Sequence, residues 1–116
     1  MAQTVSFSSD KIGDAIEVLT LNGVCDRSTA LYAEQRIGSA LDAGRTEIIV
    51  DLRGVTSLDR PMLNMLFRAL IRIGHNGRLL LVRPNASVWG LFEQSGLSKG
   101  FSTFADLRGA LATARL

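Results

Sequence analysis

The sequence predicts an α/β domain with a mixed, mostly parallel sheet of about four to five strands, an antiparallel strand at its N-terminal edge and about four helices. Strand-like and helix-like segments alternate along the 116 residues, which is typical of parallel strands joined by helices. Two short aliphatic runs, at residues 47–52 and 78–82, indicate strands covered on both faces. No linker, repeat or low-complexity tract divides the chain, so we expect one domain over residues 1–116.

The N-terminal elements are a strand pair and a helix. Residues 5–8 and 15–21 are rich in strand formers, and the polar turn between them at 10–14 is so short that the strands should pair antiparallel. Residues 28–43 predict a helix, because apolar side chains recur every three or four positions and Gly44 can end it.

A buried strand and a second helix occupy the middle of the chain. The strand at residues 47–52 is followed by a helix from about residue 61 to 73, where Gly74 can end it. The aliphatic strand at 78–82 comes next. The order strand–helix–strand therefore predicts a parallel pair.

The C-terminal third predicts two more helices around an edge strand. Asn85 can cap a third helix, which Gly96 would end in the left-handed conformation with Leu97 as its apolar contact. Residues 101–104 predict a short edge strand, and Asp106 can cap a last helix.

Composition and charge favour an ordinary soluble globular domain over several other classes. Hydrophobic residues make up 47% and charged residues 21%, with a mean hydropathy of +0.20, which excludes a disordered chain. The net charge is +2, and the basic residues are scattered instead of clustered as in a nucleic-acid site. No apolar run approaches the roughly 20 residues of a membrane span. Since the cysteine is alone and the N-terminus lacks the layout of a secretory signal, we expect a cytoplasmic protein.

The residues for most catalytic and metal-binding arrangements are missing. With one histidine and one cysteine, the chain cannot assemble a zinc cluster from those ligands, and it has no glycine-rich phosphate loop. His75 is expected to be a polar surface residue in a turn, and Cys25 a small buried thiol. Asp51 is explained by its position in a strand and Asp59 by its position as a helix cap, so neither carboxylate requires a catalytic role. We therefore expect no enzyme, no metal and no cofactor.

The second helix has two features that core packing does not require. It begins directly after Asp59, a residue suited to cap its first N–H groups, beyond the end of a buried strand. Phe67 and Ile71 fall outside its apolar core face, roughly in line with Arg60 and Asn64. These two apolar side chains either pack under a neighbouring helix or form an exposed protein-binding strip.

Three segments resemble motifs of STAS domains, the fold of bacterial anti-sigma factor antagonists. Residues 21–26 (LNGVCD) look like the family's Leu-x-Gly-x-x-Asp turn, residues 49–59 (IVDLRGVTSLD) like its strand and loop before a regulatory serine, and residues 91–97 (LFEQSGL) like its helix ending. The match extends from about residue 5 to 111 and implies a single, cytoplasmic STAS-like binding domain. Such domains capture a kinase-like anti-sigma factor and thereby release the sigma factor that it was holding.

The sequence departs from this family at the usual phosphorylation site. Family members read Asp-Ser-Ser-Gly-Leu at the start of the second helix, and the serine after the aspartate accepts phosphate from the kinase. Here residues 59–63 are DRPML, so Arg60 occupies the acceptor position with a fixed positive charge. Ser57 or Thr56 is either an unorthodox acceptor or a turn hydroxyl bonded to the local backbone.

The predicted partner-binding surface lies at two helix starts, which should meet at one end of the sheet because each follows the carboxyl end of a strand. It comprises Asp26, Arg27, Ser28, Thr29, Asp59, Arg60, Pro61, Met62, Asn64, Phe67 and Ile71. We expect a monomer or weak homodimer that binds a kinase-like anti-sigma factor, with no direct nucleic-acid contact and no membrane insertion. The alternative function is an accessory subunit of an ABC-type membrane transporter or a scaffold component of a stress-signalling complex.

Overall fold

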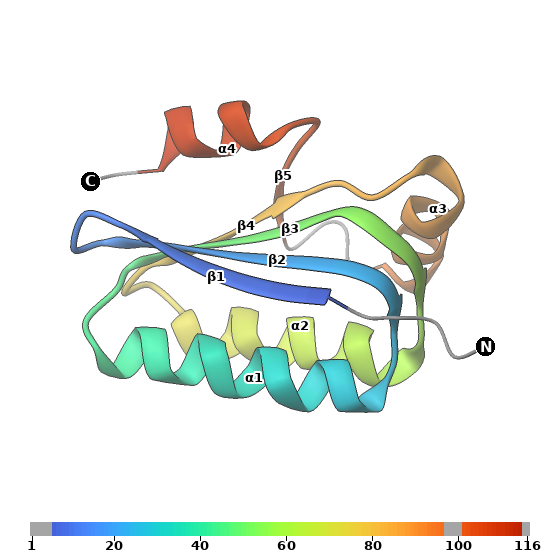
Figure 1. The fold of residues 1–116 in the computed structure, drawn as a ribbon, viewed down its shortest axis with the longest axis horizontal. Coiled ribbons are helices and arrows are strands. Elements are labelled where there is room, and N and C mark those ends of the chain that lie inside the picture. Colours follow the sequence, from blue (N-terminus) through green and yellow to red (C-terminus); the bar gives the residue numbers. More distant parts are fainter. Residues whose placement is uncertain (1–5, 97–100, 115–116) are drawn as a thin grey trace.

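A computed structural model of the chain describes residues 6–96 and 101–114. Val5 and Leu97, to which the sequence assigned a strand and a helix-end contact, lie outside the described residues. Figure 1 shows the elements in chain order. They are β1 (Ser6–Ile12), β2 (Ile16–Cys25), α1 (Arg27–Asp42), β3 (Glu47–Leu58), α2 (Arg60–Ile73), β4 (Arg78–Val82), α3 (Ala86–Ser95), β5 (Ser102–Phe104) and α4 (Leu107–Thr113).

The described strands form one sheet in the order β1-β2-β3-β4-β5. β1 is antiparallel to β2, and the other neighbouring strands are parallel. This confirms the predicted mixed, mostly parallel sheet with an antiparallel N-terminal edge. The hairpin strands are longer than predicted, because residues 10–12 of the expected turn pair with residues 16–18. The chain then reverses at Gly13, whose φ of 61° favours glycine.

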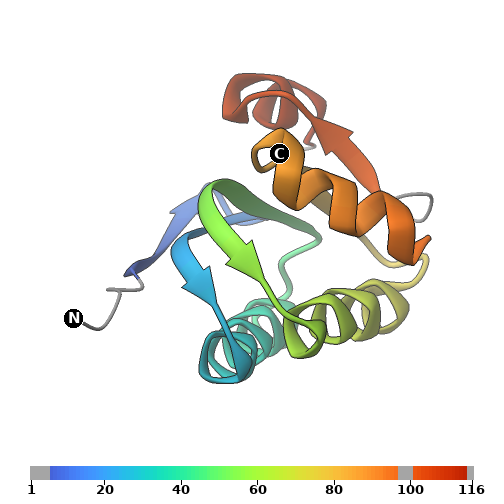
Figure 2. The same ribbon diagram turned by 90° about the vertical axis from the view of Figure 1, so that its right-hand side faces the viewer.

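Helices cover both faces of the sheet. α1 and α2 lie side by side against one face, as Figures 1 and 2 both show, and α4 covers the other. Because side chains alternate along each strand, every second residue points into one of two cores. The larger core lies between the sheet and α1, α2 and α3 and includes Leu19, Leu21, Val50, Leu52, Leu66, Leu81 and Phe92. The smaller core beneath α4 contains Ile16, Val18, Ile49, Leu80, Val82 and Ala110.

The helix boundaries follow local sequence signals. Side-chain oxygens of Asp59, Asn85 and Asp106 accept hydrogen bonds from the first turns of α2, α3 and α4, which confirms the three predicted caps. Gly96 ends α3 in the left-handed conformation at φ 79°, also as predicted. Gly74 ends α2 with a positive φ of 53°.

β3 extends to Leu58, although the sequence predicts a strand ending at residue 52 and then a loop. The extension pairs with the last residues of β2, after register shifts next to Asn22 and Gly23 that keep the two strands in contact. Gly23 has a φ of 84° at the second shift, a conformation that favours glycine. β2 and β3 therefore end level with each other, with Cys25 opposite Leu58.

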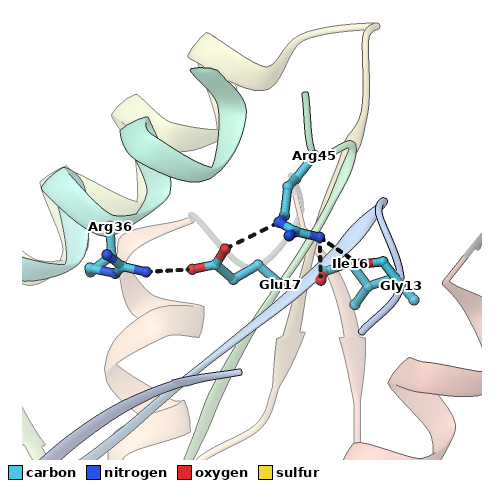
Figure 3. Close-up of polar contacts among 5 residues, drawn as sticks. All are labelled: Gly13, Ile16, Glu17, Arg36 and Arg45. Atoms are coloured by element: carbon cyan, nitrogen blue, oxygen red, sulfur yellow. Dashed lines mark hydrogen bonds and ion pairs between the residues drawn. The ribbon is translucent and has the colours of Figure 1, made fainter. Parts of the chain in front are cut away.

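A buried carboxylate joins three parts of the chain near the other end of β2 (Figure 3). Glu17, on β2, is 3% exposed. Its oxygens lie 3.1 Å from Nη2 of Arg36 on α1 and 3.5 Å from Nε of Arg45, which follows α1. Nη1 of Arg45 also donates hydrogen bonds to the carbonyl oxygens of Gly13 (2.9 Å) and Ile16 (3.4 Å). These contacts tie α1 and the α1–β3 connection to the β1–β2 hairpin.

Candidate protein-binding surface

The starts of α1 and α2 lie at the same edge of the sheet. A single residue, Asp26, separates β2 from α1, and Asp59 alone separates β3 from α2. The two strands are parallel neighbours that end level, and the backbone N–H of Asp59 donates to the carbonyl oxygen of Cys25 at 3.3 Å. The prediction that both helix starts meet at one end of the sheet is confirmed, as the right-hand side of Figure 1 shows.

Both aspartates act as helix caps. Oδ1 of Asp26 accepts from the N–H of Thr29 at 3.2 Å, and Oγ1 of Thr29 accepts from the N–H of Asp26 at 3.3 Å, a reciprocal capping box. Oδ1 of Asp59 accepts from the N–H of Met62 at 3.4 Å, and Pro61 lies in the first turn of α2, where a missing N–H is tolerated. The two carboxylates therefore stabilise the positive ends of their helices.

Two residues of the predicted surface are buried, so their assignment was wrong. Thr29 is 1% exposed, because its hydroxyl turns back into the capping box. Met62 is 0% exposed and shares the core-facing side of α2 with Met65 and Leu66. Met65 and Leu66 follow Met62 by three and four residues, and this helical spacing predicts that Met62 is buried with them.

The rest of the predicted surface reaches solvent. Phe67 is 46% and Ile71 is 64% exposed. They do not pack under a neighbouring helix, so that alternative is wrong, and the protein-binding role of the exposed pair stays a prediction. Pro61 is half-buried, and the exposed polar members are Asp26, Arg27, Ser28, Asp59, Arg60 and Asn64.

α1 packs along the side of α2 that carries two arginines. Arg68 binds Glu34 through Nε and Nη2 at 2.9 and 3.1 Å, and Nη2 of Arg72 lies 3.2 Å from Asp42. The hydrogen bonds from Arg68 lower the pKa of the Glu34 carboxyl. Since α1 lies beside Arg68 and Arg72, the side of α2 that carries Phe67 and Ile71 is left open.

Sequence reasoning missed Leu31, on α1. Its side chain is 59% exposed and follows directly after buried Ala30, off the apolar stripe of the helix. This break in helical spacing is the signal that could have found it. Leu31 lines a hollow of about 250 Å³ between the first turns of α1 and α2.

Ser57 and Thr56 lie within β3, where both side chains are exposed. The predicted role as turn hydroxyls bonded to the local backbone is therefore wrong. Ser57 pairs in register with Val24 of β2, and among the described residues neither hydroxyl makes a hydrogen bond. The hydroxyl of Ser57 is open to solvent, two residues before Asp59.

Cys25 lies between the two helix starts and is 1% exposed. Burial, together with the nearby carboxylates of Asp26 and Asp59, raises the pKa of its thiol from 9.0 to about 11. Since the thiolate is the nucleophile, this cysteine is held in an unreactive form at neutral pH.

We expect iodoacetamide to leave native Cys25 unmodified at pH 8 and to alkylate it fully in urea, as measured by intact-protein mass. Between pH 9 and 11 only the unfolded thiol ionises, so the unfolded state binds fewer protons and stability falls as pH rises. A Cys25→Ala variant should lack this part of the pH dependence. Rapid labelling of the folded protein at pH 8 would contradict the expectation.

We also looked among the described residues for a metal site and a membrane-spanning helix. They hold no group of three or more His, Cys, Asp or Glu side chains placed to bind a metal ion. His75 is exposed after α2, as expected for a turn residue. In the part of the chain that the structure describes, no helix combines the length and apolarity needed to cross a bilayer.

Comparison with known proteins gives a consistent assignment. The model of the STAS domain matches residues 9–110. The anti-sigma-F factor antagonist RsfB of Mycobacterium tuberculosis is 28% identical over 102 residues, which cover 88% of this chain and 84% of RsfB. An anti-sigma factor antagonist from Mycobacterium paratuberculosis has a TM-score of 0.85 at 22% identity, covering 97% of this chain and 96% of that one. The anti-sigma factor antagonist SpoIIAA, in its unphosphorylated form, has a TM-score of 0.76 at 21% identity, covering 91% and 93%.

The family match and the fold agree. The matched residues run from β1 into α4 and include both helix starts. The solved structures share the fold over 97% and 91% of this chain, although fewer than a quarter of aligned residues are identical. This chain belongs to the STAS domain family.

Proposed function

We propose that this protein is a cytoplasmic anti-sigma factor antagonist that acts by binding and performs no catalysis. The observation that carries the proposal is the exposed apolar pair Phe67 and Ile71 on α2, a helix whose first turn meets that of α1 at one edge of the sheet. Apolar side chains rimmed by polar ones are typical of protein-binding surfaces. The names of RsfB and SpoIIAA, both anti-sigma factor antagonists, support the same function for this chain.

The proposed partner is an anti-sigma factor with a kinase-like fold. The proposed contact surface is the exposed part of the predicted one: Asp26, Arg27, Ser28, Asp59, Arg60, Pro61, Asn64, Phe67 and Ile71. We add Leu31, which stands next to the hollow between α1 and α2. These side chains project from two helices that the sheet holds side by side (Figure 2), so little ordering is needed before they bind.

Arg60 gives this surface a charge that phosphorylation cannot change. At the first position of α2 it replaces the residue type that accepts phosphate in the family. A phosphate there would add close to two negative charges and disrupt contact by repulsion. We propose that binding is therefore not switched off at residue 60.

The binding proposal is tested by capture from the source cells with the immobilised chain, followed by mass spectrometry. We expect an anti-sigma factor among the retained proteins and its loss with a Phe67→Asp/Ile71→Asp variant. Leu91→Asp is the matched control, because Leu91 is 44% exposed but lies on α3. Retention of a transporter ATPase subunit or a large homotypic assembly, without an anti-sigma factor, would favour the alternative functions.

The phosphorylation proposal is tested with ATP and the captured anti-sigma factor, if that protein is a kinase. We expect no phosphate at residue 60 of the unmodified chain, because Arg60 has no hydroxyl group to accept it. An Arg60→Ser/Pro61→Ser variant should gain phosphate at residue 60, as shown by phosphopeptide mapping. Stoichiometric phosphate on Ser57 of the unmodified chain would show instead that the acceptor site has moved.

A further inference from the structure

The outer face of α1 and α2 presents apolar side chains from both helices. Four large apolar side chains are exposed among the described residues, and three of them are on this face: Leu31, Phe67 and Ile71. The hollow of about 250 Å³ next to Leu31 is lined by Arg27, Ala30, Leu31, Pro61, Asn64 and Arg68. Its apolar wall is formed by Ala30, Leu31 and Pro61, so the hollow suits one large apolar side chain of a partner.

On this face the carboxylates have hydrogen-bond or ion-pair partners, whereas two arginines form no ion pair with any described residue. Its carboxylates all have partners, either helix N–H groups or arginines: Asp26, Glu34, Asp42 and Asp59. Arg27 and Arg60, the first residues of α1 and α2, form no ion pair with any described residue and are exposed. Two guanidinium groups next to the positive ends of two helices are thus free to bind an anion.

We infer that the segment of the partner seated on this face is an acidic amphipathic helix. The inference deepens the proposed function and rests on it, since it names the chemistry of the anti-sigma factor's contact segment. The apolar stripe of such a helix would place one side chain in the hollow and others against Phe67 and Ile71. Its flanking carboxylates would bind Arg27 and Arg60.

The dimensions of the face agree with a helical occupant. From Pro61 at the hollow to Ile71 the face extends over ten residues of α2, about 15 Å at 1.5 Å per residue. A partner helix of about ten residues, or three turns, spans this length. A basic helix with the same apolar stripe would bring its cations against Arg27 and Arg60, and this repulsion gives the site its selectivity.

The test uses two synthetic helical peptides with the same leucine stripe, flanked by glutamate in one and by lysine in the other. In calorimetric titrations of the full chain at low salt, we expect the glutamate peptide to bind at least about tenfold more tightly. Its affinity should fall as sodium chloride is added, because the charged contacts are exposed. Phe67→Asp should abolish its binding.

A charge-reversed chain provides the matched comparison. Arg27→Glu/Arg60→Glu should prefer the lysine peptide, and it should fold, because glutamate is favourable in the first turn of a helix. Arg108→Glu, an exposed arginine on α4 at the opposite face of the sheet, should change neither affinity. Circular dichroism of each variant checks that the fold is kept.

Three results with the peptides would overturn the inference. These are equal affinity for both peptides, binding of neither, and unchanged preference in the charge-reversed chain. Sedimentation that shows a dimer lost in Phe67→Asp would also overturn it, since it would assign the face to a second copy. None of these results decides whether the chain captures an anti-sigma factor, so the two proposals fail separately.

Discussion

Replacing Glu17 with alanine is expected to lower the free energy of unfolding by about 3 kcal/mol, the lower end of the cost of breaking a buried ion pair. The variant leaves the guanidiniums of Arg36 and Arg45 without the carboxylate that lies between them (Figure 3). The lower end applies because the Arg36 side chain is 35% exposed and can reach water, whereas that of Arg45 is only 13% exposed and reaches it much less.

Equilibrium urea unfolding followed by circular dichroism measures this loss. Glu34→Ala is the matched control, because it also removes a carboxylate from an arginine pair, but one in which both side chains are exposed (55% and 40%). Water screens such a pair, so the control should change the midpoint little. Equal effects of the two substitutions would show that Glu17 does not hold α1 and the hairpin together.

Replacing Phe92 with alanine is expected to cost about 3–5 kcal/mol of folding free energy. Phe92 is 0% exposed in the larger core. Its ring stacks on Trp89 at a centroid distance of 5.6 Å and meets the edge of Phe101 at 6.5 Å. Truncation would therefore leave a cavity where α3 joins the core and remove two aromatic contacts.

The same unfolding measurement checks this prediction. Phe92→Leu should lose less stability, since it keeps most of the apolar volume. Leu91→Ala is the control from the same helix. Because Leu91 is 44% exposed, this substitution removes little buried apolar surface. If Phe92→Ala unfolded at the same urea concentration as Leu91→Ala, the ring would not support the core as described.

The helices could be predicted closely because their ends are encoded locally. Asp59 and Gly74 bracket α2, and Asn85 and Gly96 bracket α3, within a residue or two of the expected limits. The long end of β3 could not be predicted in this way. Glycine and polar residues follow residue 52, and only pairing with the shifted end of β2 keeps them extended.

The sequence was enough to predict where the candidate site lies, but not which of its side chains are exposed. Parallel strands followed at once by helices place Asp26 and Asp59 at one sheet edge, so connectivity alone gives their proximity. The exposure of Phe67 and Ile71 depends on where α1 lies. That position is set by the packing of the buried face of α1 in the larger core, against residues far apart in the chain, which no local pattern reports.

The one-residue junctions at Asp26 and Asp59 restrict how such a regulator can be controlled. A contact surface joined so closely to its sheet has no hinge, and under the proposed function the side chain of Arg60 takes up no phosphate. Under this proposal, activity depends on abundance. The cell would set its output through synthesis and proteolysis of the chain, and the number of copies relative to the partner becomes the signal.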